Sequence, residues 1–123
     1  MNNLKLSNLG HTWLLDFDGT IVIHNGYKNG GDELLPGVRE FFSTIPKGDM
    51  IIFVTSRLES ERTNIERFLQ KNGIQYSHII CGAPFGERIL INDSKPSGLV
   101  TSIAVSKVRD APFEVNCIID PNL

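Results

Sequence analysis

Apolar residues gather in short runs along this chain, and the lengths of the runs predict strands separated by helices. The candidate strands are 12–17, 50–55, 77–81, 88–92, 100–105 and 114–120. Continuous apolar runs of this length are typical of parallel strands that are covered on both faces. The segment 21–35 is rich in Gly and Asn, so it is predicted to be a loop with room for a short hairpin.

Two helices are predicted between the first three strands. The first begins at Pro36, whose fixed φ suits the first turn of a helix. Its apolar face has the spacing i, i+3, i+4, i+7 and consists of Val38, Phe41, Phe42 and Ile45. The second helix is expected from Ser56 to Asn72, because Ser56 and Glu59 have the spacing of a capping box. Gly73 is typical of the residue that follows a helix.

The alternation of strands and helices predicts an α/β fold with a mostly parallel sheet and right-handed crossovers. The 123 residues are enough for one compact domain, 1–123, and too few for two. Ligands of such sheets bind beyond the carboxyl ends of the strands. Three polar strand ends are therefore expected to meet at one edge, namely Asp16 with Asp18, Thr55 with Ser56, and Asp93.

These residue types suit a reaction at a phosphate ester. Asp16 is a candidate covalent nucleophile, and Asp18 can give a proton to the leaving oxygen and later take one from water. The hydroxyl of Thr55 and the backbone N–H groups near Ser56 can hold phosphate oxygens. Asp16 and Asp93 are candidate ligands for Mg²⁺, which prefers oxygen donors and usually takes one or two protein carboxylates.

The same residues resemble a known family, the haloacid dehalogenase-like (HAD) phosphatases. The residues Asp16-Phe17-Asp18-Gly19-Thr20 resemble the family's first signature, and the strand ending at Thr55 resembles its second. The strand ending at Asp93 resembles its fourth. The resemblance implies a Rossmann-like three-layer sandwich, a Mg²⁺ cofactor and a phosphoaspartate intermediate. It also implies that Asp16 is the nucleophile and a metal ligand, that Asp18 is the acid/base and binds the metal through its backbone carbonyl, and that Asp93 holds the metal.

The third signature, a Lys or Arg, is less clear in this chain. No Lys stands beside the Gly82-Ala83-Pro84 stretch, where related small members often place one. Arg88 is the first substitute and Lys95 the second. The family's fourth signature often has two acids, whereas Asn92 precedes Asp93 here. The spacing leaves no room for a cap domain, so the active site is expected to be open to a large substrate or closed by another subunit of a homo-oligomer.

Composition narrows the partners and the location. The net charge is −2, without a stripe of Lys and Arg, so nucleic acid is not favoured as a partner. No apolar run approaches a membrane span, and residues 1–10 lack the layout of a signal peptide. Cys81 and Cys117 form no paired motif and are interpreted as reduced thiols. These features predict a soluble cytoplasmic protein. The resemblance implies that it acts on a small phosphorylated molecule, with sugar phosphates as one class.

Simpler structural interpretations stay open for each of these residues. Asp18 and Gly19 could form a type I′ hairpin turn. Ser56 could be only a helix cap, Asp93 a turn residue, and Arg88 a solvated side chain at the start of a strand. The alternative function is a non-catalytic phosphate-binding or regulatory module that keeps the site geometry. Asp120 also ends an apolar run, matches no signature and is expected in a turn.

Overall fold

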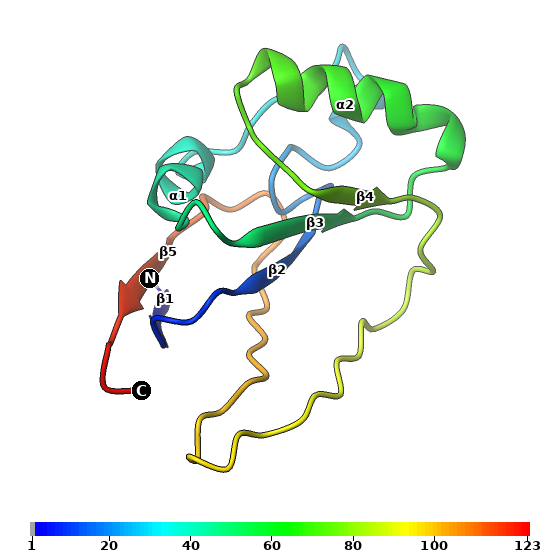
Figure 1. Cartoon of the computed structure of the whole chain (residues 1–123). Helices are drawn as coiled ribbons and strands as arrows, with labels where there is room; N and C mark the ends of the chain where they lie inside the picture. Colours follow the sequence, from blue (N-terminus) through cyan, green and yellow to red (C-terminus); the bar gives the residue numbers. More distant parts are fainter. Residues whose placement is uncertain (1) are drawn as a thin grey trace.

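A computed structural model of the chain, described here for residues 2–123, contains two small parallel sheets. The larger sheet has the order β2-β3-β4, with β2 at Thr12–Asp16, β3 at Met50–Val54 and β4 at His78–Ile80. The smaller sheet pairs β1, Asn2–Leu6, with β5, Val115–Ile119 (Figure 1). The predicted mixture of helices and parallel strands is confirmed, including the strand predicted at 114–120. The pairing of β1 had no counterpart in the prediction.

Both α-helices pack on the same face of the larger sheet. Helix α1 spans Val38–Thr44 and follows β2, whereas α2 spans Arg62–Lys71 and connects β3 to β4. Short 3-10 turns lie at Gly26–Lys28 (η1) and Glu59–Glu61 (η2). One hydrophobic core joins sheet and helices, and its fully buried members include Phe17, Val38, Phe53, Ile65 and Leu69. Because side chains alternate along a strand, this core uses only every second strand residue.

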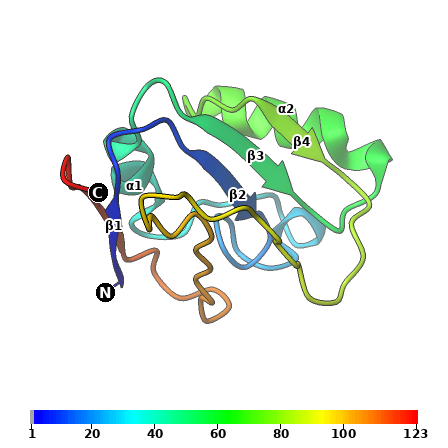
Figure 2. The same cartoon turned by 60° about the horizontal axis from the view of Figure 1, so that its bottom comes forward.

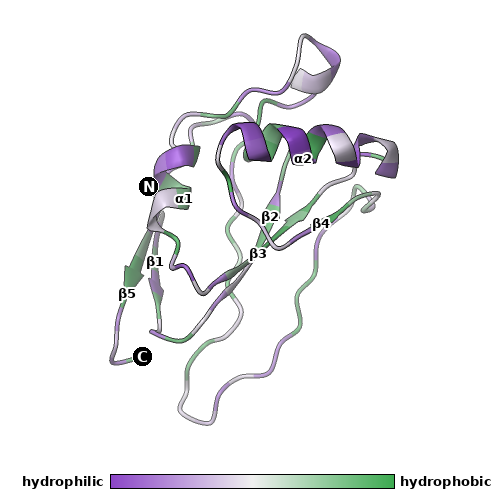
Figure 3. Cartoon of the chain, turned by 45° about the horizontal axis from the view of Figure 1, so that its top comes forward, coloured by the Kyte–Doolittle hydropathy of each residue, from purple (hydrophilic) through white to green (hydrophobic). Residues whose placement is uncertain are grey.

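The opposite face of the larger sheet is partly open to solvent. Leu14, Met50 and Ile80 point to that side and are exposed. The helices described in residues 2–123 cover the other face, so the three-layer arrangement is not confirmed. Figure 3 shows that apolar residues continue on strands and loops away from the helices.

Two predicted strands, 88–92 and 100–105, are absent from the described structure. The chain between β4 and β5 instead makes a long extended excursion that leaves the larger sheet at β4 and ends at β5 in the smaller sheet (Figures 1 and 2). Ile91 is 91% exposed, and no neighbouring strand pairs with this segment. The sequence prediction was wrong here because an apolar run indicates β-propensity, whereas a strand also needs a partner whose backbone groups are aligned with its own.

The second helix begins later than predicted, and Ser56 is not its cap. Helix α2 begins at Arg62, and Glu61 at its N-cap makes no side-chain hydrogen bond. The backbone after β3 is held in another conformation, because the N–H of Arg57 donates to Thr55 Oγ1 at 3.1 Å and the N–H of Gly82 donates to the Arg57 carbonyl at 2.7 Å. The predicted end of the helix is confirmed, with Asn72 as C-cap.

A buried carboxylate joins the amino ends of β2 and β3. Asp49, whose side chain is 2% exposed, accepts hydrogen bonds from the Trp13 indole at 2.9 Å and from the backbone N–H of His11 at 3.1 Å. The oxygen that accepts from the Trp13 indole, Oδ2, also lies 2.8 Å from Nδ1 of His11. Nε2 of His11 in turn contacts the Ser7 carbonyl. Burial alone raises the pKa of Asp49, but the hydrogen bonds from Trp13 and His11 outweigh it and lower the pKa below its ordinary value.

This arrangement predicts an acid-sensitive contribution to stability. A pKa that is lower in the folded protein than in the unfolded chain contributes stability in full above the unfolded value of about 3.9, and the contribution is lost as pH falls through the folded value. We expect Asp49→Asn to lower the free energy of unfolding at pH 7, and the gap to wild type to shrink below about pH 4. Urea denaturation across this range measures the gap, and a gap independent of pH would contradict the assignment.

Candidate functional site

Asp16 ends β2 at the carboxyl edge of the sheet. Its side chain is 38% exposed, so a ligand can reach it. One oxygen accepts a hydrogen bond from Arg88 NH1 at 2.8 Å, and the other accepts the hydroxyl of Thr20 at 2.9 Å. Thr20 reaches back because the chain folds tightly after β2, where the Phe17 carbonyl accepts the N–H of Ile21 at 2.9 Å. The sequence prediction that Asp16 stands at the C-terminal end of a strand is confirmed.

Asp18 lies in this tight loop and faces a different cation. Its carboxylate accepts hydrogen bonds from Arg57 Nε at 3.0 Å and Arg57 NH2 at 2.7 Å. The alternative type I′ turn at Asp18 and Gly19 is wrong. That turn needs a positive φ at both residues, whereas only Gly19 has one, of +82°. The two carboxylates therefore differ in environment, since Asp16 is half exposed beside Arg88 and Asp18 is held by a buried guanidinium.

Thr55 and Ser56 follow β3 at the same edge. Thr55 is 1% exposed, and its hydroxyl donates to Asp18 Oδ2 at 3.4 Å and accepts the N–H of Arg57. Its hydroxyl is therefore turned toward Asp18 and away from solvent. Ser56 is half-buried beside it. The structure thus brings the predicted residues Asp16, Asp18, Thr55 and Ser56 to one edge, as the parallel topology predicts.

Arg57 is the main site residue that the sequence analysis did not identify. Its side chain is 1% exposed and contacts Asp18, Asp32 and, at 3.9 Å, Glu61. Burial lowers the pKa of Arg57, but the hydrogen bonds that it donates to Asp32 and Asp18 outweigh burial and raise this pKa, so the guanidinium stays charged. Arg57 directly follows the predicted strand-end residues, and that position was the only signal for it in the sequence.

The two candidate cations of the third signature are placed differently. Arg88 contacts Asp16, whereas Lys95 belongs to a turn in which its backbone N–H donates to the Leu99 carbonyl at 3.4 Å. Asp93 belongs to the same excursion, and its backbone carbonyl accepts the hydroxyl of Thr101. Of the three predicted residues in the stretch 88–95, the structure brings Arg88 to Asp16.

A second segment, 107–110, packs against the loop after β2 and was also missed. The Gly19 carbonyl accepts the N–H of Asp110 at 2.9 Å and Lys107 Nζ at 3.3 Å. Asp110 Oδ1 in turn accepts the N–H of His24 at 2.8 Å. Burial lowers the pKa of Lys107, with Asp110 acting in the opposite direction. The segment 107–110 lies more than 80 positions from Gly19 and His24 in the chain, so no local sequence pattern predicts that they are in contact.

The predicted metal ligands do not form one cluster. In the part of the chain that the structure describes, no group of three or more His, Cys, Asp or Glu side chains is arranged to hold a metal ion. Both oxygens of Asp16 accept protein hydrogen bonds, and the recorded partner of Asp93 is Thr101 in the excursion. This arrangement does not fit the expected Mg²⁺ site.

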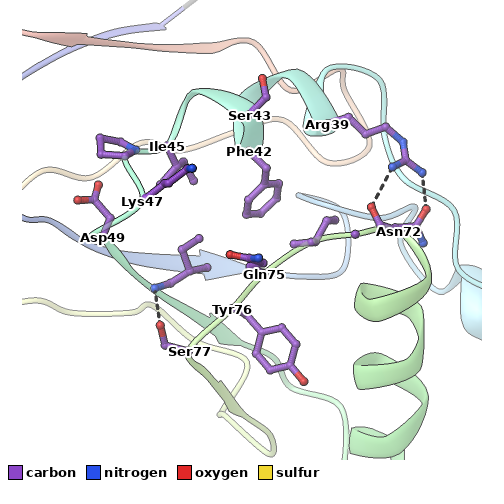
Figure 4. A pocket seen from close by; sticks show the side chains of 14 residues that line it. Arg39, Phe42, Ser43, Ile45, Lys47, Asp49, Asn72, Gln75, Tyr76 and Ser77 are labelled. Carbon is purple, nitrogen blue, oxygen red and sulfur yellow. Dashed lines mark hydrogen bonds between the residues drawn. The ribbon is translucent and has the colours of Figure 1, made fainter.

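A hollow lies at the opposite edge of the sheet, at the amino ends of β3 and β4. It has a volume of about 530 Å³ and lies between the end of α1 and the segment 72–77 (Figure 4). Phe42 and Tyr76 contribute apolar surface, and Arg39 donates to the Asn72 carbonyl at 2.9 Å. None of the candidate site residues lines this hollow.

Two other predictions concern cysteines and membranes. Cys81 and Cys117 are half-buried free thiols, and burial raises the pKa of each. Within residues 2–123, no helix combines the length and apolar character that crossing a membrane requires.

Comparisons with protein-family models, curated proteins and solved structures found no match to this chain.

Proposed function

We propose that the protein hydrolyses a phosphomonoester through an aspartyl-phosphate intermediate on a Rossmann-like core. The observation that carries the proposal is the pair of carboxylates at the end of β2, where accessible Asp16 contacts Arg88 and Asp18 is held separately by Arg57. The parallel order β2-β3-β4, with α2 as the crossover between β3 and β4, supports the core. The resemblance to HAD phosphatases agrees with both features.

The proposed chemistry has two balanced steps. An oxygen of Asp16 attacks phosphorus while the ester P–O bond breaks, and its electron pair stays on the leaving oxygen, which takes a proton from Asp18. Water then attacks the phosphorus of the aspartyl phosphate and gives a proton to Asp18. Phosphate leaves, Asp16 is again a carboxylate, and Asp18 is again the carboxylic acid that began the cycle. The open edge admits a phosphorylated sugar or another metabolite.

Arg88 is proposed to offset the negative charge of the phosphate. Its guanidinium is half exposed and already lies against the nucleophile, so it can contact a phosphate oxygen bound there. We expect Arg88→Met to lower kcat/KM for an aryl phosphate by about 100-fold, because a cation aimed at the developing charge is lost. Lys95→Met is the matched control, with an expected change below about twofold. Equal losses in the two variants would contradict the role of Arg88.

The Mg²⁺ ion that the resemblance implies does not fit the arrangement of Asp16 and Asp93 among the described residues. The proposal for Asp16, Asp18 and Arg88 does not depend on the expected third ligand, Asp93. Assays are therefore run both with Mg²⁺ and with a chelator, and the roles of the side chains are compared under the condition that gives turnover.

The proposed function is tested by trapping the intermediate. The protein is mixed with a ³²P-labelled aryl phosphate, quenched in acid and digested. We expect a label on the peptide that contains Asp16, and we expect hydroxylamine to release it, because an acyl phosphate reacts with that nucleophile. Turnover with no label on this peptide would rule out Asp16 as the covalent nucleophile, and the absence of turnover across a broad ester panel would rule out the phosphatase.

A non-catalytic phosphate-binding module is the second candidate. It is favoured by one observation, that both oxygens of Asp16 and the carboxylate of Asp18 already accept hydrogen bonds from protein groups. Titration calorimetry with inorganic phosphate distinguishes the candidates when it is combined with the ester panel. Binding without hydrolysis of any ester supports the module.

A further inference from the structure

Arg57 links the candidate acid/base to the loop that follows β2. Its guanidinium donates to Asp18 through Nε and NH2, and to Asp32 through NH1 at 3.0 Å and NH2 at 2.6 Å. Two carboxylates thus bind two edges of one planar group, and paired contacts of this kind fix its orientation. Any rotation of the guanidinium would break hydrogen bonds to both Asp18 and Asp32.

Two aromatic rings also lie close to the same guanidinium. The centre of the Tyr27 ring lies 3.8 Å from the central carbon of Arg57, and the centre of the Phe17 ring lies 5.0 Å from it. A cation over an aromatic face is attracted by the ring quadrupole. Tyr27 and Asp32 both belong to the loop 21–35, so this loop holds the arginine from two directions.

The loop is itself tied to the first signature. The N–H of Ile23 donates to the Glu33 carbonyl at 3.1 Å, and the N–H of Leu35 donates to the Ile21 carbonyl at 2.9 Å. These antiparallel contacts place the tip of the loop over Arg57. A continuous set of contacts therefore runs from Asp32, through Arg57, to the carboxylate of Asp18.

We propose that Arg57 is a positioning residue that aims the Asp18 carboxylate at the leaving oxygen, and that Asp32 of the loop 21–35 holds Arg57 for this task. The proposal rests on the proposed phosphatase function. Arg57 does not act on phosphate itself, because a side chain that is 1% exposed presents almost no surface to a ligand. Its effect on the reaction passes through Asp18. A charged group buried without direct access to substrate is also costly to retain for packing alone.

The test exploits the dependence of the reaction on its leaving group. An alkoxide must be protonated as the ester bond breaks, whereas a nitrophenolate leaves readily without an acid. Asp32→Asn keeps the shape of the loop residue but weakens its hold on Arg57. We expect kcat for an alkyl phosphate to fall about 30-fold and kcat for p-nitrophenyl phosphate to fall less than about threefold, with KM little changed for both.

Two further variants complete the experiment. Arg57→Lys keeps the charge but loses the planar fork, and we expect the same selective loss for the alkyl ester. Glu61→Gln is the matched control, because Glu61 lies 3.9 Å from Arg57 NH1, beyond hydrogen-bond distance, whereas Asp32 accepts a hydrogen bond from the same nitrogen at 3.0 Å. We expect this variant to leave both esters unaffected. Thermal melting of each variant confirms that it is folded, and Asp32→Asn provides the test on its own where Arg57→Lys does not fold.

The outcomes separate this proposal from the function on which it rests. A wild type that hydrolyses neither ester overturns the phosphatase and the positioning role together. A wild type that hydrolyses both, with Asp32→Asn slowing them by the same factor, overturns only the positioning role, because a structural defect would not select between leaving groups. A selective loss for the alkyl ester in Asp32→Asn, with Glu61→Gln unchanged, supports it.

Discussion

Replacing Asp16 by asparagine is expected to reduce kcat for an aryl phosphate on the order of 10³-fold or more, because the substitution removes the oxygen that forms the covalent bond. The amide has nearly the same size and can still meet Arg88 and Thr20, which contact the two carboxylate oxygens in the structure. The loss should therefore arise in the chemical step. Steady-state turnover should fall by this factor and the acid-quenched label on the peptide should be lost, while the melting temperature changes little.

Asp120→Asn is the matched control for this substitution. Asp120 also follows a strand, β5, and its carboxylate accepts the N–H of Asn122. The predicted turn role of Asp120 agrees with that contact, and we expect the control variant to keep full activity. Equal turnover by wild type and Asp16→Asn would rule out the nucleophile, and an equal loss in Asp120→Asn would show that the effect is not specific to the site.

The sequence predicted the part of the site that depends on topology. Parallel strands that alternate with helices bring their carboxyl ends to one edge, so Asp16 and Thr55 could be placed together from their positions at the ends of apolar runs. The choice between Arg88 and Lys95 depended on where a long connection passes, and periodicity carries no information about that path. The contact of Arg88 with Asp16 comes from tertiary structure.

The missed residues share a physical explanation. Arg57 is recognised as a site residue only through its contacts with Tyr27 and Asp32. These two residues reach Arg57 because the loop 21–35 folds back over the edge of the sheet. The apolar run at 88–92 failed as a strand prediction for the converse reason, since its composition favours a strand and no partner strand receives it. Local patterns predicted elements here, whereas side-chain pairs between distant segments could not be read from them.

Gly37→Ala is expected to be the most destabilising single methyl addition among the glycines of the structure. Gly37 precedes α1 with φ +88°, and a Cβ at this position would lie 2.2 Å from the carbonyl oxygen of Phe113. The N–H of Phe113 donates to the Pro36 carbonyl at 2.7 Å, so the two backbones cannot separate without losing that bond. We expect the free energy of unfolding to fall by about 3 kcal/mol or more, measured by urea denaturation.

Two other glycines separate the causes of this loss. Gly98 has a positive φ of 92° with no atom within 4 Å of an added Cβ, so Gly98→Ala should cost only the backbone strain, about 1 kcal/mol. Gly48 has neither a positive φ nor a nearby atom, so Gly48→Ala should change stability by less than about 0.5 kcal/mol. The difference between Gly37→Ala and Gly98→Ala then measures the contact between α1 and the chain before β5. Equal losses at these two positions would mean that Phe113 does not pack against Gly37. The contact of the preceding segment 107–110 with the loop of Asp18 would then not be fixed by Phe113.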